Sequence, residues 1–254
     1  IMKTHLITIL VISIIYLPNC SLNAAFENSH IRSAIFSIVQ NSNKNDYVYL
    51  NSQNYMSFPF LDSYGFGVQK MIRKTPVALS VYMTGDKLYN EMMINVSAGH
   101  HLSRHFEATI LLSGYKVSIL NHGSVSTLSM GLSTTYLLRT DLELTVLMDN
   151  IGFLSQKPIN DDIPKRGEIS LISTFLPGQS VNYSMIQDYP YPLDHRFFWQ
   201  SEITNNITIK GGITSNPQSY IGCSKLRYIK MSLIIGYLFN PILGNILNVG
   251  FEWG

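Results

Sequence analysis

The sequence predicts an all-β fold: a transmembrane antiparallel β-barrel of about fourteen strands, with twelve as the alternative, after a cleaved signal peptide. From residue 47 onward, apolar and polar residues alternate in one segment after another, as in strands with one apolar face. Charged residues make up only 13% of the chain, about half the share of roughly 25% found in soluble domains. The alternating segments are close in length to the roughly 9–11 residues with which a tilted strand crosses a bilayer.

Residues 1–25 have the pattern of a cleavable signal peptide. Lys3 supplies a positive charge near the start, and the stretch from Leu6 to Leu17 is almost entirely apolar. Because this stretch is short for a membrane-spanning helix, we expect export and cleavage after Ala24 or Ala25.

Residues 26–46, FENSHIRSAIFSIVQNSNKND, have a short apolar centre between polar flanks. A leading strand, a plug in the lumen and a loose arm are all compatible with this composition. The predicted organisation is therefore a signal peptide over 1–25, an N-terminal arm or plug over 26–46 and a barrel over 47–254.

Fourteen strands are predicted in chain order, over 47–58, 63–73, 76–87, 90–102, 105–120, 125–139, 141–152, 166–177, 179–188, 196–205, 207–216, 219–229, 230–240 and 244–254. Apolar residues at every second position mark the clearest of them, from Val77 to Met83, Met92 to Ala98, Phe106 to Leu112, Leu128 to Leu132, Leu142 to Met148 and Met231 to Phe239. Tight joints follow the even-numbered strands, and the longer connections follow odd-numbered ones. Outer-membrane barrels have this asymmetry.

The last predicted strand, 244–254, has Leu247, Val249, Phe251 and Trp253 on one face. We expect it to pair with the first strand, because an open sheet edge in lipid leaves unpaired backbone groups that cost several kcal/mol each. Its apolar face would then contact outer-membrane lipid, with Phe251 and Trp253 as interface aromatics.

The opposite face of the strands supplies the candidate lumen-lining residues. Charged side chains in mid-strand are costly in lipid, which favours an interior position for them. Two interpretations stay open, a lined conduit and a polar interior that fills and stiffens the barrel. The candidates are Asn95, Glu107, Glu143, Asp149, Glu168, Gln200, Glu202, Lys210, Lys225 and Glu252.

Other chemistries find little support. His100, His101 and His105 flank a turn, but a metal site would need ligands from elsewhere, so we interpret them as a polar turn. Asp161 and Asp162 are interpreted as part of a solvated loop. No catalytic motif occurs in a suitable context, so we expect no enzyme activity, no metal and no cofactor. The formal net charge of +2 and the lack of a basic cluster argue against nucleic acid.

Roughly residues 90 to 254 resemble the PorV/PorQ-type outer-membrane proteins, relatives of the FadL-like hydrocarbon transporters. The matching motifs are Tyr115 to Ile119 before Gly123-Ser124, Asn150-Ile151-Gly152 at a strand end, Gly212 to Pro217, and Pro241 to Gly244 before a last strand that ends on aromatics. The resemblance implies a barrel in the outer membrane of a diderm bacterium and no catalytic residue. The N-terminal part departs from the family, since it lacks the Gly-Gly-Ala and Asn-Pro-Ala segments.

The resemblance implies passage of small hydrophobic solutes or an accessory part in a protein secretion system. A non-transporting scaffold barrel is the alternative within the same fold. A soluble secreted β-sandwich adhesin is the alternative outside it, and it would stay in solution without detergent.

Overall fold

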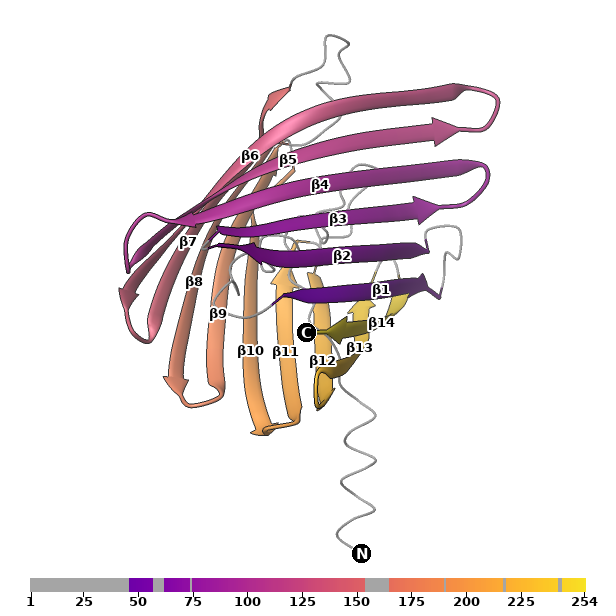
Figure 1. The fold of residues 1–254 in the computed structure, drawn as a ribbon. Coiled ribbons are helices and arrows are strands. Elements are labelled where there is room, and N and C mark those ends of the chain that lie inside the picture. The colour runs from indigo at the N-terminus through magenta and orange to yellow at the C-terminus, as the bar shows by residue number, and fades with distance from the viewer. Residues whose placement is uncertain are drawn as a thin grey trace, which may run out of the picture.

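The computed structural model describes residues 46–56, 62–73, 75–153, 165–189, 191–216, 218–241 and 244–254. The predicted signal peptide and nearly all of the predicted arm or plug lie outside these residues, so both stay predictions. Fourteen strands form one closed antiparallel barrel in which each strand pairs with its neighbours in sequence (Figure 1). The strands are β1 Tyr47–Tyr55, β2 Ser63–Ile72, β3 Thr75–Gly85, β4 Tyr89–His101, β5 Phe106–Ile119, β6 Gly123–Arg139, β7 Leu142–Phe153, β8 Lys165–Leu176, β9 Gln179–Tyr189, β10 Asp194–Thr204, β11 Ile207–Ser215, β12 Gln218–Tyr228, β13 Met231–Asn240 and β14 Gly244–Trp253.

The predicted fold class and the strand number of fourteen are confirmed, and the alternative of twelve is wrong. Strand β10 begins at Asp194, two residues before the predicted start, and β1 ends at Tyr55, earlier than predicted. No helix among the residues that the structure describes is long and apolar enough to span a membrane.

The barrel closes between the first and last strands, as predicted. Strand β1 pairs with β14 in a continuous antiparallel register from Val48↔Trp253 to Tyr55↔Ile246. Beyond the ladder, the backbone N–H of Met56 donates to the carbonyl of Asn245 at 3.1 Å. This pairing leaves no open edge along the wall, which is the condition for a sheet in lipid.

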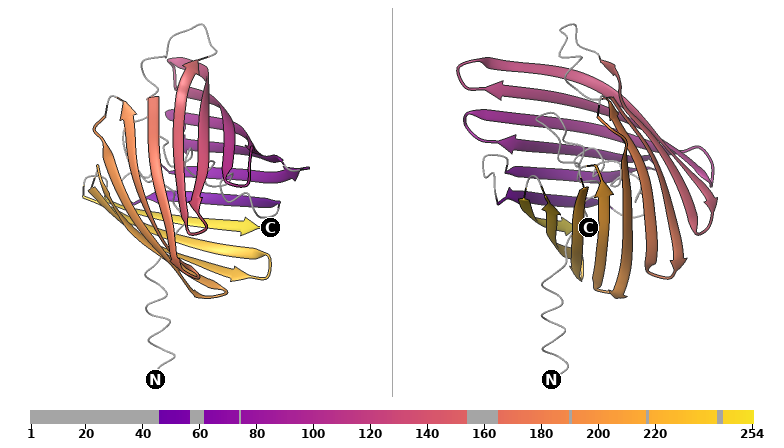
Figure 2. Two further views of the ribbon diagram at one scale, coloured as in Figure 1. Left: turned by 90° about the vertical axis from the view of Figure 1, so that its left-hand side faces the viewer. Right: turned by 180° about the vertical axis from the view of Figure 1, so that it is seen from behind.

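The strands are strongly tilted. In Figure 1, β2 to β5 run across the view while β8 to β11 run steeply down it, so strands on opposite walls cross. The turned views in Figure 2 show the same wall from the side and from behind. Tilt of this kind is what closing a sheet into a barrel requires.

The wall is apolar outside and polar inside. On β4, Ile94 and Val96 are exposed on the outer face, whereas Asn95 and Ser97 between them are buried on the inner face. The same alternation recurs around the barrel, and the buried side chains of the described residues are more often polar than hydrophobic. A soluble β-sandwich would bury its apolar face, so the adhesin alternative is wrong.

The connections divide the barrel into two ends. Joints after even-numbered strands are short, such as residues 177–178, where Gly178 has a φ of +74°. We call this the turn end, and β1 begins and β14 ends there. The longest connection, 154–164, follows an odd-numbered strand at the opposite, loop end, although two- and three-residue joints also occur there.

One of the short joints at the loop end is held by a carboxylate. Asp86 Oδ1 accepts hydrogen bonds from the backbone N–H groups of Leu88 at 2.7 Å and Tyr89 at 3.0 Å. These two bonds, with that of Tyr89 the stronger influence, hold the pKa of the exposed Asp86 carboxyl below its usual range.

Two glycines on β2 make room for tyrosine rings on the inner wall. Gly67 pairs with Tyr49 on β1, and Gly65 pairs with Tyr82 on β3. A Cβ added at Gly67 would overlap the ring of Tyr49, and one added at Gly65 would overlap the ring of Tyr82. The rings therefore lie flat across neighbouring strands, where they cover glycine backbone.

Replacing Gly67 with Ala is expected to destabilise the barrel by about 1–3 kcal/mol, because the added methyl group must displace the Tyr49 ring. The measurement is the temperature at which the compact form is lost on unheated gels. Gly167→Ala is the matched control, since nothing lies within 4 Å of its added Cβ. Equal stability of the two variants would contradict the expected overlap.

Candidate functional site in the barrel interior

The inner face carries its charged side chains near the strand ends. At the loop end, we define the loop-end cluster as Asp149, Arg166, Glu168, Asp188, Asp194 and Arg196, from four successive strands β7 to β10. All six residues are buried. Fourteen strands enclose more space than the eight of a barrel that side chains fill, so this wall can surround a pathway.

Arg166 is the centre of the cluster. The register sets it directly opposite Asp149 on one side and Asp188 on the other. Its Nη2 donates to Glu168 Oε2 at 2.8 Å, and its Nη1 lies 3.8 Å from Asp188 Oδ2. Three carboxylates around one guanidinium keep a charge that has no solvent contact compensated.

Asp194 and Arg196 form the second half of the cluster. Arg196 Nε donates to Asp194 Oδ2. Asp194 Oδ1 accepts from the backbone N–H of Ser215 at 3.1 Å and of Asn216 at 2.9 Å. The carboxylate therefore ties the inner wall to the joint between β11 and β12.

An irregularity in β7 brings Asp149 into this cluster. The register between β6 and β7 shifts around Gly131. Between the pairs Met130↔Gly152 and Leu132↔Met148, residues 149–151 of β7 lie opposite Gly131 alone. Asn150 has a φ of +54°, and both Asp149 and Asn150 are buried. The amide oxygen of Asn150 accepts from Ser129 Oγ at 2.7 Å. This β-bulge re-aims one extra polar side chain into the wall.

Between the two ends, the inner face of β3 to β6 carries no charged residue, and we call this zone the waist. One row of it is polar, running from Ser80 through Asn95 and Ser113 to Ser129 across four paired strands. Met93 and Leu111 in this zone are apolar and buried. Elsewhere on the inner wall, buried apolar residues alternate with the charged ones, namely Leu147, Ile186, Phe198, Ile221, Ile234 and Leu238. The waist can thus contact hydrocarbon as well as single polar groups.

The turn end carries a second set of charges. His101 Nδ1 lies 3.2 Å from Glu107 Oε2, and Lys225 donates to Glu252. Lys210 Nζ lies 5.1 Å from the ring centroid of Phe198, a cation–π distance. These contacts give the turn end both signs of charge.

The structure distributes the ten predicted lumen-lining residues over all three zones. Asp149 and Glu168 belong to the loop-end cluster, and Asn95 belongs to the waist. Glu202 is exposed near the end of β10, at the turn end. The remaining residues lie towards the turn end, namely Glu107, Glu143, Gln200, Lys210, Lys225 and Glu252.

The two predicted interface aromatics lie on the outer face near the turn end. Phe251 is 51% exposed and pairs with Leu50, and Trp253 is 63% exposed and pairs with Met231. Aromatic rings on the outer face near the strand ends are typical of the girdles of membrane barrels.

Sequence reasoning missed four of the six residues of the loop-end cluster. Arg166 opened the predicted strand 166–177 but was not among the lumen-lining candidates; it lies in β8 and is fully buried. The predicted solvated loop with Asp161 and Asp162 lies outside the described residues. The missed signal is a pair of opposite charges two residues apart on one strand face, as in Arg166 with Glu168 and Asp194 with Arg196.

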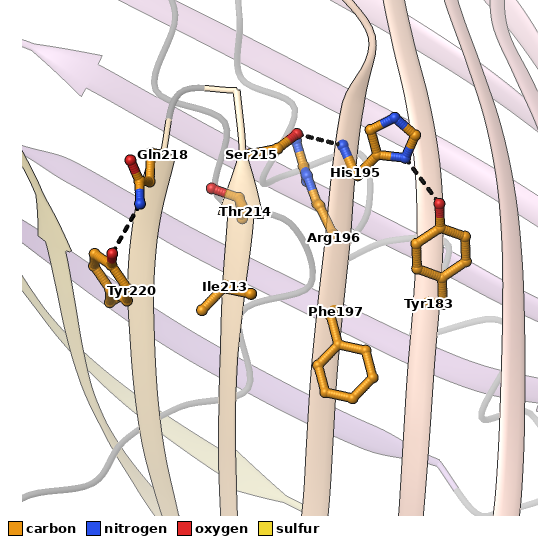
Figure 3. Close-up of a pocket in the computed structure, with 9 residues that line it drawn as sticks. All are labelled: Tyr183, His195, Arg196, Phe197, Ile213, Thr214, Ser215, Gln218 and Tyr220. Carbon is orange, nitrogen blue, oxygen red and sulfur yellow. Dashed lines mark hydrogen bonds between the residues drawn. The ribbon is translucent and has the colours of Figure 1, made fainter.

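A hollow of about 410 Å³ lies on the outer wall near the loop end (Figure 3). Tyr183, Phe197 and Tyr220 surround it, and His195 Nδ1 is 2.8 Å from the Tyr183 hydroxyl. Its aromatic lining and its place on the outer face fit contact with lipid. The described residues contain no group of three or more His, Cys, Asp or Glu that could hold a metal ion.

A closed antiparallel barrel with an apolar outside and a polar inside is the fold of transmembrane β-barrels, and the protein has this fold. No protein-family model matches the chain, and no curated protein matches it.

Solved structures match the whole barrel at low identity. The CymD monoaromatic hydrocarbon channel superposes with a TM-score of 0.62 at 8% identity, over 83% of this chain and 88% of that one. The toluene transporter TodX of Pseudomonas putida superposes with a TM-score of 0.57 at 8% identity, over 82% of this chain and 88% of that one. The likeness is one of fold.

Replacing Arg166 with Met is expected to destabilise the barrel by about 3–5 kcal/mol, because it leaves Glu168 and Asp188 buried without their shared cation. Arg139→Met is the control. The Arg139 side chain is 72% exposed beside Asp141, so the loss there is expected at about 0–1 kcal/mol. Urea midpoints of the detergent-solubilised barrels measure both, and a similar loss for both would contradict the role of the cluster.

Proposed function

We propose that the protein is a conduit for small hydrophobic solutes in the outer membrane of a diderm bacterium. The uncharged, partly apolar waist carries this proposal. An ion would lose its hydration there without finding a charged partner, whereas a hydrocarbon ring would meet Met93 and Leu111.

The known proteins of the same fold support the proposal. CymD is a channel for monoaromatic hydrocarbons, and TodX is a transporter of toluene. A solute of similar size and polarity is the natural candidate for this lumen. The ten candidate lumen-lining residues would then form the two charged mouths and part of the waist of the pathway.

The turn motifs that resemble PorV/PorQ-type proteins leave a second role for the same barrel, as an accessory part of protein secretion or as a scaffold. No contact or surface of the described residues favours that role over the conduit. A barrel that passes no solute and co-purifies with exported proteins would favour it.

The location is tested first. The mature protein is expected to leave the outer-membrane fraction only with detergent, and to migrate faster on gels when it is not boiled, because a closed barrel resists detergent unfolding. Release by a salt wash, with no mobility shift on boiling, would contradict the proposed location in the outer membrane.

Transport is tested with N-phenyl-1-naphthylamine, a hydrophobic dye that fluoresces in membranes and that an intact outer membrane excludes. Cells that carry the barrel are expected to take up the dye several-fold faster than cells without it. Ser113→Arg should remove most of the gain, because it puts a long charged side chain into the waist, where Ser113 is fully buried.

Thr174→Arg is the matched control, since Thr174 lies on the inner face at the turn end and is exposed. It should leave the uptake close to that of the unmodified barrel. Both variants must first show the mobility shift on boiling. Uptake that is no faster with the unmodified barrel than without it would argue against a conduit.

A further inference from the structure

The Arg196 side chain is buried without enough partners. It has no solvent-exposed surface, and it lies on the inner face between Ser184 on β9 and Thr214 on β11. Only its Nε is bonded, to Asp194. Neither of its terminal nitrogens, Nη1 and Nη2, has a hydrogen-bond partner among the described residues. Leaving several buried N–H donors unpaired is costly, so these two nitrogens point to an acceptor that binds there.

The guanidinium is held in place for such an acceptor. One carboxylate oxygen of Asp194 accepts a hydrogen bond from Nε. The other oxygen accepts hydrogen bonds from the backbone N–H groups of Ser215 and Asn216 at 3.1 and 2.9 Å. Because the guanidinium is planar, fixing Nε also restricts the plane in which the two terminal nitrogens lie. Such a fork presents two parallel donors to the lone pairs of an oxygen ligand.

The charge around Arg196 selects the kind of oxygen. The loop-end cluster contains four carboxylates and two guanidinium groups, which gives a net charge of −2 when all are ionised. Glu168 is close enough to interact electrostatically with Arg196 as well as with Arg166. An anionic ligand would add a further negative charge to this excess, so a neutral acceptor oxygen fits better.

The apolar residues next to Arg196 indicate that the rest of the ligand is a hydrocarbon group. Phe198 follows Arg196 on the same inner face of β10, and Ile186 pairs with Asp194 from β9. Both side chains are buried and apolar. A molecule whose oxygen meets Arg196 would therefore rest its hydrocarbon part towards the waist.

We propose that Arg196 is the polar contact of a solute-binding site at the loop end of the lumen, and that this site takes neutral oxygenated hydrocarbons such as phenols. The inference rests on the proposed conduit function and names the solute class within it.

Three probes with the same ring test the site: p-cresol with a neutral oxygen, toluene with none, and p-toluate with a carboxylate. Their binding to the detergent-purified barrel is measured by titration calorimetry. For the unmodified barrel, p-cresol is expected to bind roughly tenfold more tightly than toluene, since a hydrogen bond to a charged donor is the stronger kind. It should also bind more tightly than p-toluate.

In Arg196→Met the preference for p-cresol over toluene should disappear, and Arg196→Lys should restore part of it. Arg139→Met, at an exposed turn-end pair, should keep the full preference. All variants are first checked for the mobility shift on boiling. If Arg196→Met does not fold, the order of the three probes on the unmodified barrel still decides the solute class.

Equal binding of p-cresol and toluene, tightest binding of p-toluate, or a preference that survives in Arg196→Met would each overturn the assignment to Arg196. Fast dye uptake by cells together with any of these results leaves the conduit standing and removes only this site. If none of the probes binds, the site is refuted, and slow dye uptake would refute the conduit as well.

Discussion

The hydrogen-bond ladder between β1 and β14 is the constraint on which the rest of the structure depends. In hydrocarbon, each unpaired backbone group costs several kcal/mol, so a sheet can cross a membrane only if it has no edge. The register from Val48↔Trp253 to Tyr55↔Ile246 satisfies both edge strands at once. Once the ring is closed, every side chain must point either to lipid or to the interior, and the period of two fixes which.

Once the barrel is closed, the main energetic cost of the fold is the burial of polar and charged side chains on its inner face. The outer face needs only apolar side chains, while the inner face must satisfy polar and charged groups that water reaches poorly. Arg166 shows how this is done, with Asp149 and Asp188 opposite it and Glu168 at 2.8 Å. Charges gathered at the two ends leave the waist free of them, and the proposed passage of a hydrocarbon rests on this arrangement.

The loop end is also where the wall departs from regular strands. The bulge opposite Gly131 turns both Asp149 and Asn150 inward, and Asp194 joins the wall to the backbone at Ser215 and Asn216. These irregular features converge on the loop-end cluster, in which Arg196 keeps two terminal nitrogens without partners among the described residues. Local distortion and an incompletely satisfied buried cation at one place are what a binding site would be expected to show.

The sequence by itself determined the strands, their order and the face of the residues in regular strands, because alternation with a period of two is local and survives in any antiparallel pairing. It also determined that Phe251 and Trp253 would face lipid once β14 paired with β1. The bulge at Asp149 and Asn150, which turns both inward, was visible only in the structure. Only the tertiary structure decided which polar residues meet. Arg166 and Asp188 lie on different strands, and their pairing depends on the register between β8 and β9. A register is set by all the turns and pairings of a closed ring together, so no segment of the sequence contains it.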